Sequence, residues 1–220
     1  MERRRIATAV RLTLIMLVAA GLLLWFVYRP WALSWGTTPG EVGATMPGDG
    51  SVAHPGWSAT RAVTIDAPAE AIWPWIVQMG YQKAGFYSYD RLDNDGIPSA
   101  ETIIREYQGL AVGDLLPLSR TAHVRVVEIT RPESMVWEFV TKGGRSDATW
   151  VWVLVPQGSE RTRLLTRLRL GPVTVRQRLL LDLGEIVMMR KCMLGIKRRA
   201  ESLHAATGPE HARGARRGSS

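Results

Sequence analysis

The chain has 220 residues, 46% of them hydrophobic and 22% charged, which fits one sizeable globular domain with an appendage and excludes a wholly disordered protein. The net charge of +8 is concentrated at the two ends, because residues 30–208 hold 20 Lys and Arg against 18 Asp and Glu. A nearly neutral central region argues against a dedicated surface for nucleic acid.

Near the N-terminus, residues 12–28 form an uncharged run, LTLIMLVAAGLLLWFVY. At about 1.5 Å per residue this run spans roughly 26 Å, and residues 6–10 extend it beyond Arg11. Trp25, Tyr28 and Trp31 suit the interfacial belt that borders a bilayer. We therefore expect one transmembrane helix in residues 1–32.

Arginines set the expected orientation of this helix. Arg3, Arg4 and Arg5 precede the apolar run, whereas Arg29 alone follows it closely. The positive-inside bias then places the N-terminus in the cytoplasm and the rest of the chain outside, as a single-pass protein of the cell membrane. A cleaved signal peptide is the alternative, and we disfavour it because no A-x-A cleavage pattern follows the run.

The remainder divides by composition into three parts. Residues 33–60 are rich in Gly, Pro, Ser and Thr without sustained periodicity, which predicts an extended connector. Residues 61–205 carry the periodic segments of a folded domain. Residues 206–220 end in TGPEHARGARRGSS, which predicts a disordered basic tail.

Within the domain, RAVTIDAP (61–68) predicts a strand and PAEAIWPWIVQMG (68–80) a helix. Turn-forming residues separate further strand-like runs and predict consecutive hairpins, with one turn at Gly143 and Gly144. These runs cover residues 114–118, 124–130, 135–141, 149–156 and 162–170. Apolar residues spaced by three and four then predict a long amphipathic helix over 184–203.

The last predicted strand alternates leucines with Arg163, Arg167 and Arg169. Successive side chains of a strand point to opposite faces of the sheet. We therefore expect the three arginines on a solvated sheet face rather than in a specific anion site. The single cysteine, Cys192, lies among methionines and is expected to be a small buried hydrophobic residue.

Four segments resemble members of the SRPBCC superfamily, which includes START-like, polyketide cyclase-like and lipid-transport-like domains. They are TRAVTIDAPAEAIWPWIVQMG, GFYSYDRLDN, GLAVGDLLPL and MMRKCMLGIKRRAE, and the resemblance runs from about Trp35 to Leu203. The lead-in WGTTPGEVGATMPGD resembles a membrane-associated bacterial branch of that superfamily. The resemblance implies an α+β helix-grip fold, in which a curved antiparallel sheet wraps a long C-terminal helix and leaves a cavity between them.

The resemblance also implies where a ligand would bind. Apolar and aromatic walls with a few polar groups suit a hydrophobic small molecule or a lipid. The positions expected to contact it are Trp75, Gln78, Met79, Phe86, Tyr87, Tyr89, Asp90, Trp137, Trp150, Trp152, Met189 and Met193. Each of these aromatic residues could equally pack the core, and the group as a whole favours a cavity.

Two other functions stay open. A cyclase or dehydratase needs a general acid or base, for which Asp90 is the candidate, with Glu106 and Tyr107 as further possibilities. A non-catalytic interaction module would have a filled core and would use the basic strand face. The sequence has no nucleophile, metal or nucleotide motif, and we expect no metal and no cofactor. Of the four histidines, only His123 could enter a pocket.

Overall fold

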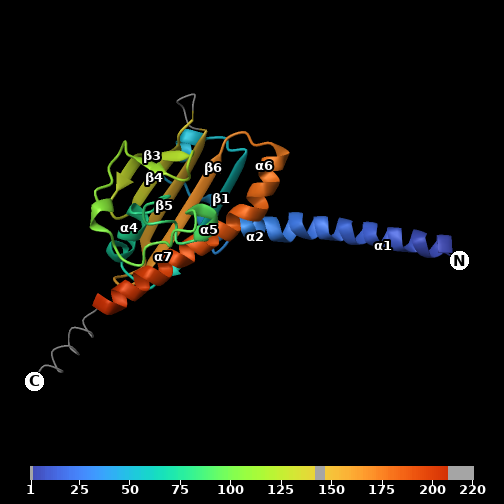
Figure 1. Ribbon diagram of the computed structural model, residues 1–220, viewed down its shortest axis with the longest axis horizontal. Helices are drawn as coiled ribbons and strands as arrows, with labels where there is room; N and C mark the ends of the chain where they lie inside the picture. The colour runs from blue at the N-terminus through green and yellow to red at the C-terminus, as the bar shows by residue number, and fades with distance from the viewer. Residues whose placement is uncertain (1, 142–146, 208–220) are drawn as a thin grey trace, which may run out of the picture.

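The computed structural model describes residues 2–141 and 147–207 (Figure 1). Helix α1 (Glu2–Leu23), the π-helical turn η1 (Leu24–Tyr28) and α2 (Arg29–Leu33) follow one another and project from the folded domain as one N-terminal helix. The helix spans 32 residues, and an 18-residue window within it has a mean hydropathy of 2.3 and no buried residue, so its length and composition are sufficient to cross a membrane.

Six antiparallel strands form one curved sheet in the order β1-β6-β5-β4-β3-β2. The strands are β1 (Trp57–Ile65), β2 (Leu115–Pro117), β3 (His123–Thr130), β4 (Ser134–Phe139), β5 (Ala148–Pro156) and β6 (Thr162–Leu170). Strands β2 to β6 follow one another as hairpins, as predicted, and β1 pairs with β6 from Trp57 opposite Leu170 to Ile65 opposite Thr162. The predicted turn at Gly143 and Gly144 lies outside the described residues.

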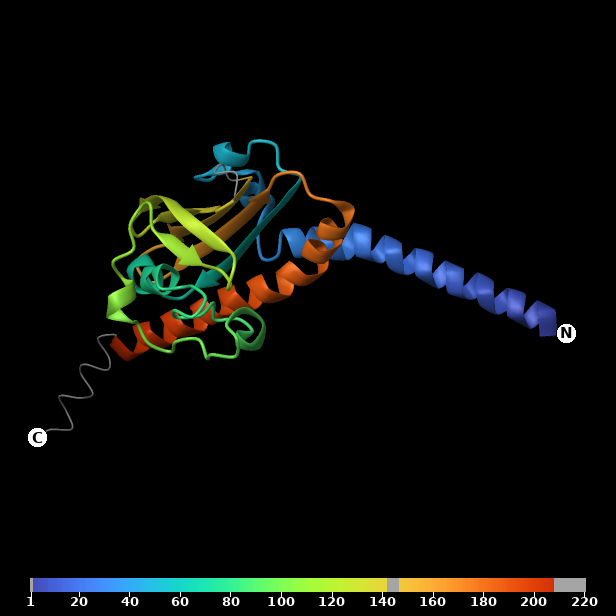
Figure 2. The ribbon, with the colours of Figure 1, turned by 45° about the horizontal axis from the view of Figure 1, so that its top comes forward.

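The helices lie mainly on one face of this sheet (Figure 2). After β1 come α4 (Ala69–Val77), the single turns α5 (Asp90–Asp93) and η3 (Arg105–Tyr107), and after β6 come α6 (Val175–Leu180), the π-helical η4 (Leu181–Glu185) and α7 (Ile186–Thr207). Helix α7 crosses the sheet, and Met193 and Ile196 pack with Trp75, Trp137 and Trp152 in the main core. The predicted helix-grip fold is therefore confirmed.

The ends of the last helices differ from the prediction. Thr174 and Gln177 form a reciprocal capping box that starts α6, which the sequence reading did not include. Helix α7 extends to Thr207, so residues 206 and 207 are helical. The rest of the predicted disordered tail lies outside the described residues.

The arginines of β6 are covered, which overturns the expectation of a solvated sheet face. Residues 36–56 of the connector fold over that face with a short helix, α3 (Pro39–Gly43), and the 3₁₀ turn η2 (Asp49–Val52). Arg163 binds Glu41 at 2.7 Å, while Arg167 and Arg169 bind Asp49 at 2.7 and 3.0 Å. The side chain of Arg167 is only 4% exposed. An alternating strand pattern identifies a polar face but does not distinguish water from a polar covering segment.

Both edges of the sheet carry another segment of the chain. On the β1 side, the Ala62 N–H donates to the Trp35 carbonyl at 3.1 Å. On the opposite side β2 has three residues, and the carbonyl of Pro117 accepts from the Tyr81 N–H at 2.8 Å. Proline itself has no N–H to offer to a further strand.

Candidate functional site

A cavity of about 240 Å³ lies between the sheet and the first turns of α7. Its walls come from the segment before and within α5, from Leu118 directly after β2, from strands β4, β5 and β6, and from the end of η4 and the first turns of α7. The lining residues are Phe86, Ser88, Asp93, Leu118, Phe139, Trp150, Leu168, Glu185, Met188, Met189 and Cys192. Eight of these eleven side chains are apolar or sulfur-containing, so the cavity suits a hydrophobic molecule.

Trp150 forms the sheet-side wall and is held by its neighbours. Its indole N–H donates to Thr166 Oγ1 at 2.8 Å. Trp137 meets it edge-on with ring centres 5.1 Å apart, and the ring of Trp152 lies 5.2 Å away. Such edge-on and tilted contacts are favourable arrangements for aromatic rings. The period of two along β5 places Trp150 and Trp152 on the same face.

Asp93 and Glu185 are the two carboxyl groups in the cavity wall. Burial raises the pKa of the Asp93 carboxyl above its ordinary value of 3.8, and the charge of Asp90 raises this pKa further. Asp93 Oδ1 is buried and has no hydrogen-bond partner among the described residues. Ser88, also in the wall, donates to the Met188 carbonyl at 3.0 Å.

Glu185 differs from Asp93 because a cation binds it. The Arg61 guanidinium, from β1, donates to Glu185 Oε1 at 2.9 Å and also to the Ala32 carbonyl at 2.9 Å. Burial raises the pKa of Glu185, and Arg61 opposes this change. One arginine thus connects the cavity wall with the base of the N-terminal helix.

Three of the predicted ligand-contacting residues line the cavity: Phe86, Trp150 and Met189. Five others are buried in the core behind the lining, namely Trp75, Met79, Trp137, Trp152 and Met193. These five shape the cavity through the side chains they support, without lining it.

Gln78 and Tyr87 are buried in a hydrogen-bond network. The Tyr87 hydroxyl donates to the Trp75 carbonyl at 2.9 Å and accepts from Gln78 Nε2 at 3.0 Å. Gln78 Oε1 also accepts from the Ile104 N–H at 2.9 Å. Burial raises the pKa of Tyr87, so this phenol stays neutral. The network ties α4 to the loops on either side of α5.

Tyr89 and Asp90 are not among the residues that line this cavity. Lys191 Nζ lies 3.8 Å from the centre of the Tyr89 ring, and Asp90 Oδ1 accepts from Ser99 Oγ at 2.5 Å. The other acid–base candidates, Glu106 and Tyr107 in η3 and His123 at the start of β3, are not among the lining residues either. Among the described residues, no group of three or more His, Cys, Asp or Glu could hold a metal ion.

Sequence reasoning missed Asp93, Glu185, Ser88 and Met188. Asp93 lies in the single turn α5 between two loops, where no periodic pattern indicates which side chains share a face. Glu185 could have been found, because it precedes Met188 and Met189 by three and four residues on one helical segment, which places all three near one face.

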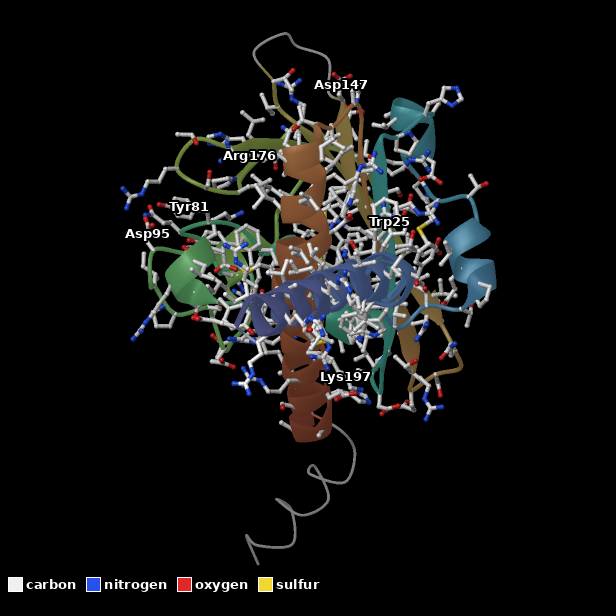
Figure 3. The ribbon with its side chains drawn as sticks, turned by 90° about the vertical axis from the view of Figure 1, so that its right-hand side faces the viewer. Trp25, Tyr81, Asp95, Asp147, Arg176 and Lys197 are labelled. Carbon is white, nitrogen blue, oxygen red and sulfur yellow. The ribbon has the colours of Figure 1, made fainter. Side chains whose placement is uncertain are left out.

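The base of the N-terminal helix is attached to the domain beside this cavity. Arg29 Nε binds Asp182 Oδ2 at 2.8 Å, and the indole N–H of Trp57 donates to Asp182 Oδ1 at 2.8 Å. The Tyr28 hydroxyl donates to the Leu183 carbonyl at 3.3 Å. Figure 3 views the molecule from the side on which the N-terminal helix leaves it, with Trp25 on that helix and Arg176 on α6.

A scan against protein-family models finds no match, and a search of curated proteins finds none. Several solved structures are similar. A Nitrosospira multiformis protein is 13% identical with a TM-score of 0.45, over 71% of this chain and 99% of that one. A polyketide cyclase-like protein of Corynebacterium glutamicum is 15% identical with a TM-score of 0.37, over 69% and 96%.

An HSP90 activator from Plasmodium falciparum is 17% identical with a TM-score of 0.39, over 59% of this chain and 89% of that one. At these identities a likeness concerns the fold alone. With TM-scores below 0.5, the helix-grip assignment rests on the strand order and on the position of α7.

Proposed function

We propose that this protein is a membrane-anchored binding protein for a hydrophobic small molecule or a lipid. The observation that carries the proposal is the apolar cavity of about 240 Å³ between the sheet and α7, in the place where helix-grip domains hold ligands. The resemblance of four sequence segments to the SRPBCC superfamily, and of the lead-in WGTTPGEVGATMPGD to a membrane-associated bacterial branch of it, supports the same function.

The N-terminal helix would act as the anchor. Its arginines at positions 3–5 favour a cytoplasmic N-terminus and a domain outside the cytoplasmic membrane. Tethering raises the effective concentration of the cavity near a membrane-dissolved ligand without any added contact.

The volume of the cavity and the charges in its wall limit the size and the chemistry of the ligand. Pockets for drug-sized molecules have volumes of about 300–1,000 Å³, so this one suits a smaller molecule or one segment of an acyl chain. The Asp93 carboxyl in the wall favours a ligand with a hydroxyl group, because a hydroxyl can donate to the ionised carboxyl and accept from the protonated one. An anionic group would meet two carboxyls and is disfavoured.

The test is extraction of co-purified molecules from the full chain in detergent, followed by mass spectrometry. Lipids around the N-terminal helix would also co-purify, so the wild type is compared with Leu168→Trp, which fills the cavity from β6. Val155→Trp introduces the same side chain at an exposed position and serves as the control.

A passenger that is present in the wild type and the control, and is lost in Leu168→Trp, would establish the cavity ligand and its class. Identical extracts from all three proteins would refute binding in the cavity.

An enzyme of cyclase or dehydratase type is the second candidate, and the observation that favours it is Asp93. A carboxyl with a raised pKa in an apolar cavity is suited to general acid catalysis. Its test is turnover of the extracted ligand, which Asp93→Asn should abolish while sparing binding. An interaction module using the basic strand face is disfavoured because the connector covers that face.

A further inference from the structure

Helix α6 and the turns that follow it expose a row of apolar side chains. Val175 is 77% exposed and Leu180 is 65% exposed. Leu179, Leu183 and Val187 are also exposed. None of these residues belongs to the apolar run near the N-terminus. Five large apolar side chains within 13 residues need a covering partner.

These side chains lie beside the last turns of the N-terminal helix. A groove of about 540 Å³ separates the two elements, with Gly21, Leu24 and Trp25 on one wall and Leu179 and Leu183 on the other. The chain thus places α6 at the level of residues 21–28, where the predicted membrane span ends. Figures 1 and 3 show α6 close to this base of the helix.

The contacts of Asp182 hold α6 beside residues 21–28 of the N-terminal helix. Asp182 belongs to η4, directly after α6, and both of its carboxylate oxygens are bound, one by Arg29 and one by Trp57. Since Arg29 follows the apolar run immediately, α6 cannot move away from the end of the span without breaking these contacts.

Exposed cations border the apolar row. Arg176 lies on α6, and Arg190 and Lys191 lie on the first turns of α7. Trp25 and Trp31, both exposed, occupy the same end of the N-terminal helix. Apolar side chains bordered by arginine, lysine and tryptophan are typical of a helix in the interfacial layer of a bilayer.

We infer that the segment Val175–Val187 is a second membrane contact, which lies in the interfacial layer of the same bilayer that the N-terminal helix crosses. Its leucines and valines enter the acyl boundary, and Arg176 and Arg190 face lipid phosphates. The inference rests on the anchoring in the proposed function and deepens it. Glu185, Met188 and Met189 of the cavity wall lie within or next to this segment, so this contact brings the cavity wall close to the bilayer.

The test uses the full chain in vesicles of phosphatidylcholine and phosphatidylglycerol, with Cys192→Ala removing the native thiol. A nitroxide is attached at one introduced cysteine at a time, and its collisions with oxygen and with a water-soluble nickel chelate report its depth. The sites are Leu180→Cys in α6, Leu17→Cys in the N-terminal helix, and Val112→Cys, an exposed apolar position elsewhere on the domain.

We expect the labels at positions 17 and 180 to favour oxygen and the label at position 112 to favour the chelate. A label at position 17 in lipid with one at position 180 in water would overturn the second contact and leave the anchor intact. A label at position 17 in water would refute the anchor and the contact together.

A charge inserted into the row gives an independent check. Leu179→Glu should raise the chelate collisions of the label at position 180 several-fold, because it places a carboxylate in the acyl boundary. Val155→Glu puts the same charge on β5 and should leave the label unchanged. If neither substitution changes the collisions, the segment does not contact lipid.

Discussion

Arg29 and Asp182 are joined by an ion pair of 2.8 Å although 153 positions separate them in the chain. Trp57 binds the other carboxylate oxygen, so one side chain of η4 holds both the base of the N-terminal helix and the first residue of β1. The angle between that helix and the domain therefore depends on Asp182.

Asp182→Ala should loosen this junction. We expect a loss of about 1–3 kcal/mol in the free energy of unfolding, because the substitution removes hydrogen bonds to a charged group. Spin labels at Leu17→Cys and Val155→Cys report the distance between the N-terminal helix and the domain. Double electron–electron resonance should show a broader distribution of this distance in Asp182→Ala. Asp66→Ala, which removes an ion pair whose two side chains are 63% and 59% exposed, should leave both quantities nearly unchanged.

Asp49→Ala should release the connector from the outer face of the sheet. The substitution leaves the buried Arg167 without its carboxylate and should cost about 3 kcal/mol or more, as for other buried pairs that lose one partner. Amide hydrogen exchange over residues 38–53 should accelerate. Glu160→Ala, which removes an exposed partner of His204, provides the control, and equal exchange in both variants would contradict this account.

Gly195→Ala should destabilise the protein because α7 approaches the loop before α5 closely there. A Cβ atom at position 195 would lie 2.4 Å from the Tyr87 carbonyl oxygen, which requires a backbone shift and should cost about 1–3 kcal/mol. Gly184→Ala is the matched control, since its Cβ would meet nothing within 4 Å. It should stabilise the helical segment by up to about 1 kcal/mol. Thermal unfolding should give a lower melting temperature for Gly195→Ala than for the wild type and an equal or higher one for Gly184→Ala.

Asp93→Asn should raise stability at neutral pH. The pKa of Asp93 is raised in the folded state by burial and by Asp90, so the folded protein binds its proton more tightly than the unfolded chain. The protonated Asp93 carboxyl therefore contributes to the free energy of unfolding at low pH. This contribution is lost as the pH rises from about 3.8 through the folded-state pKa of Asp93. Asparagine cannot ionise, so the Asp93→Asn variant does not lose this free energy of unfolding when the pH rises.

The gain in melting temperature of Asp93→Asn over the wild type should shrink as the pH falls toward 3.8. Asp66→Asn, at an exposed carboxyl, serves as the reference. A gain that is independent of pH would show that the carboxyl charge is not its cause.

Most of the sheet and α7 could be predicted from periodicity, because each strand and helix carries its own apolar pattern. The runs at 124–130 and 149–156 match β3 and β5 within one residue at each end. Strand β1 begins at Trp57, before the predicted start, because it lengthens by pairing with β6 over nine residues. That pairing is long-range and leaves no local signal.

The candidate site was less predictable than the fold. Its walls come from six separate segments of the chain. Asp93 lines the cavity, whereas Asp90, three residues earlier, binds Ser99. A sequence pattern gives the face of a regular helix or strand, whereas α5 is one turn between loops. The cover over Arg163 and Arg167 was missed for a related reason, since Glu41 and Asp49 reach them from more than 115 residues away.

The two edges of the sheet are partly covered by other segments of the chain, which affects how a further strand could bind there. Peptides often associate by adding a strand to an exposed sheet edge. Here the Trp35 backbone already occupies part of the β1 edge, and β2 offers three residues that end in a proline. Strand addition, whether by a partner or by a second copy during aggregation, is therefore hindered at Ala62 of β1 and at Pro117 of β2.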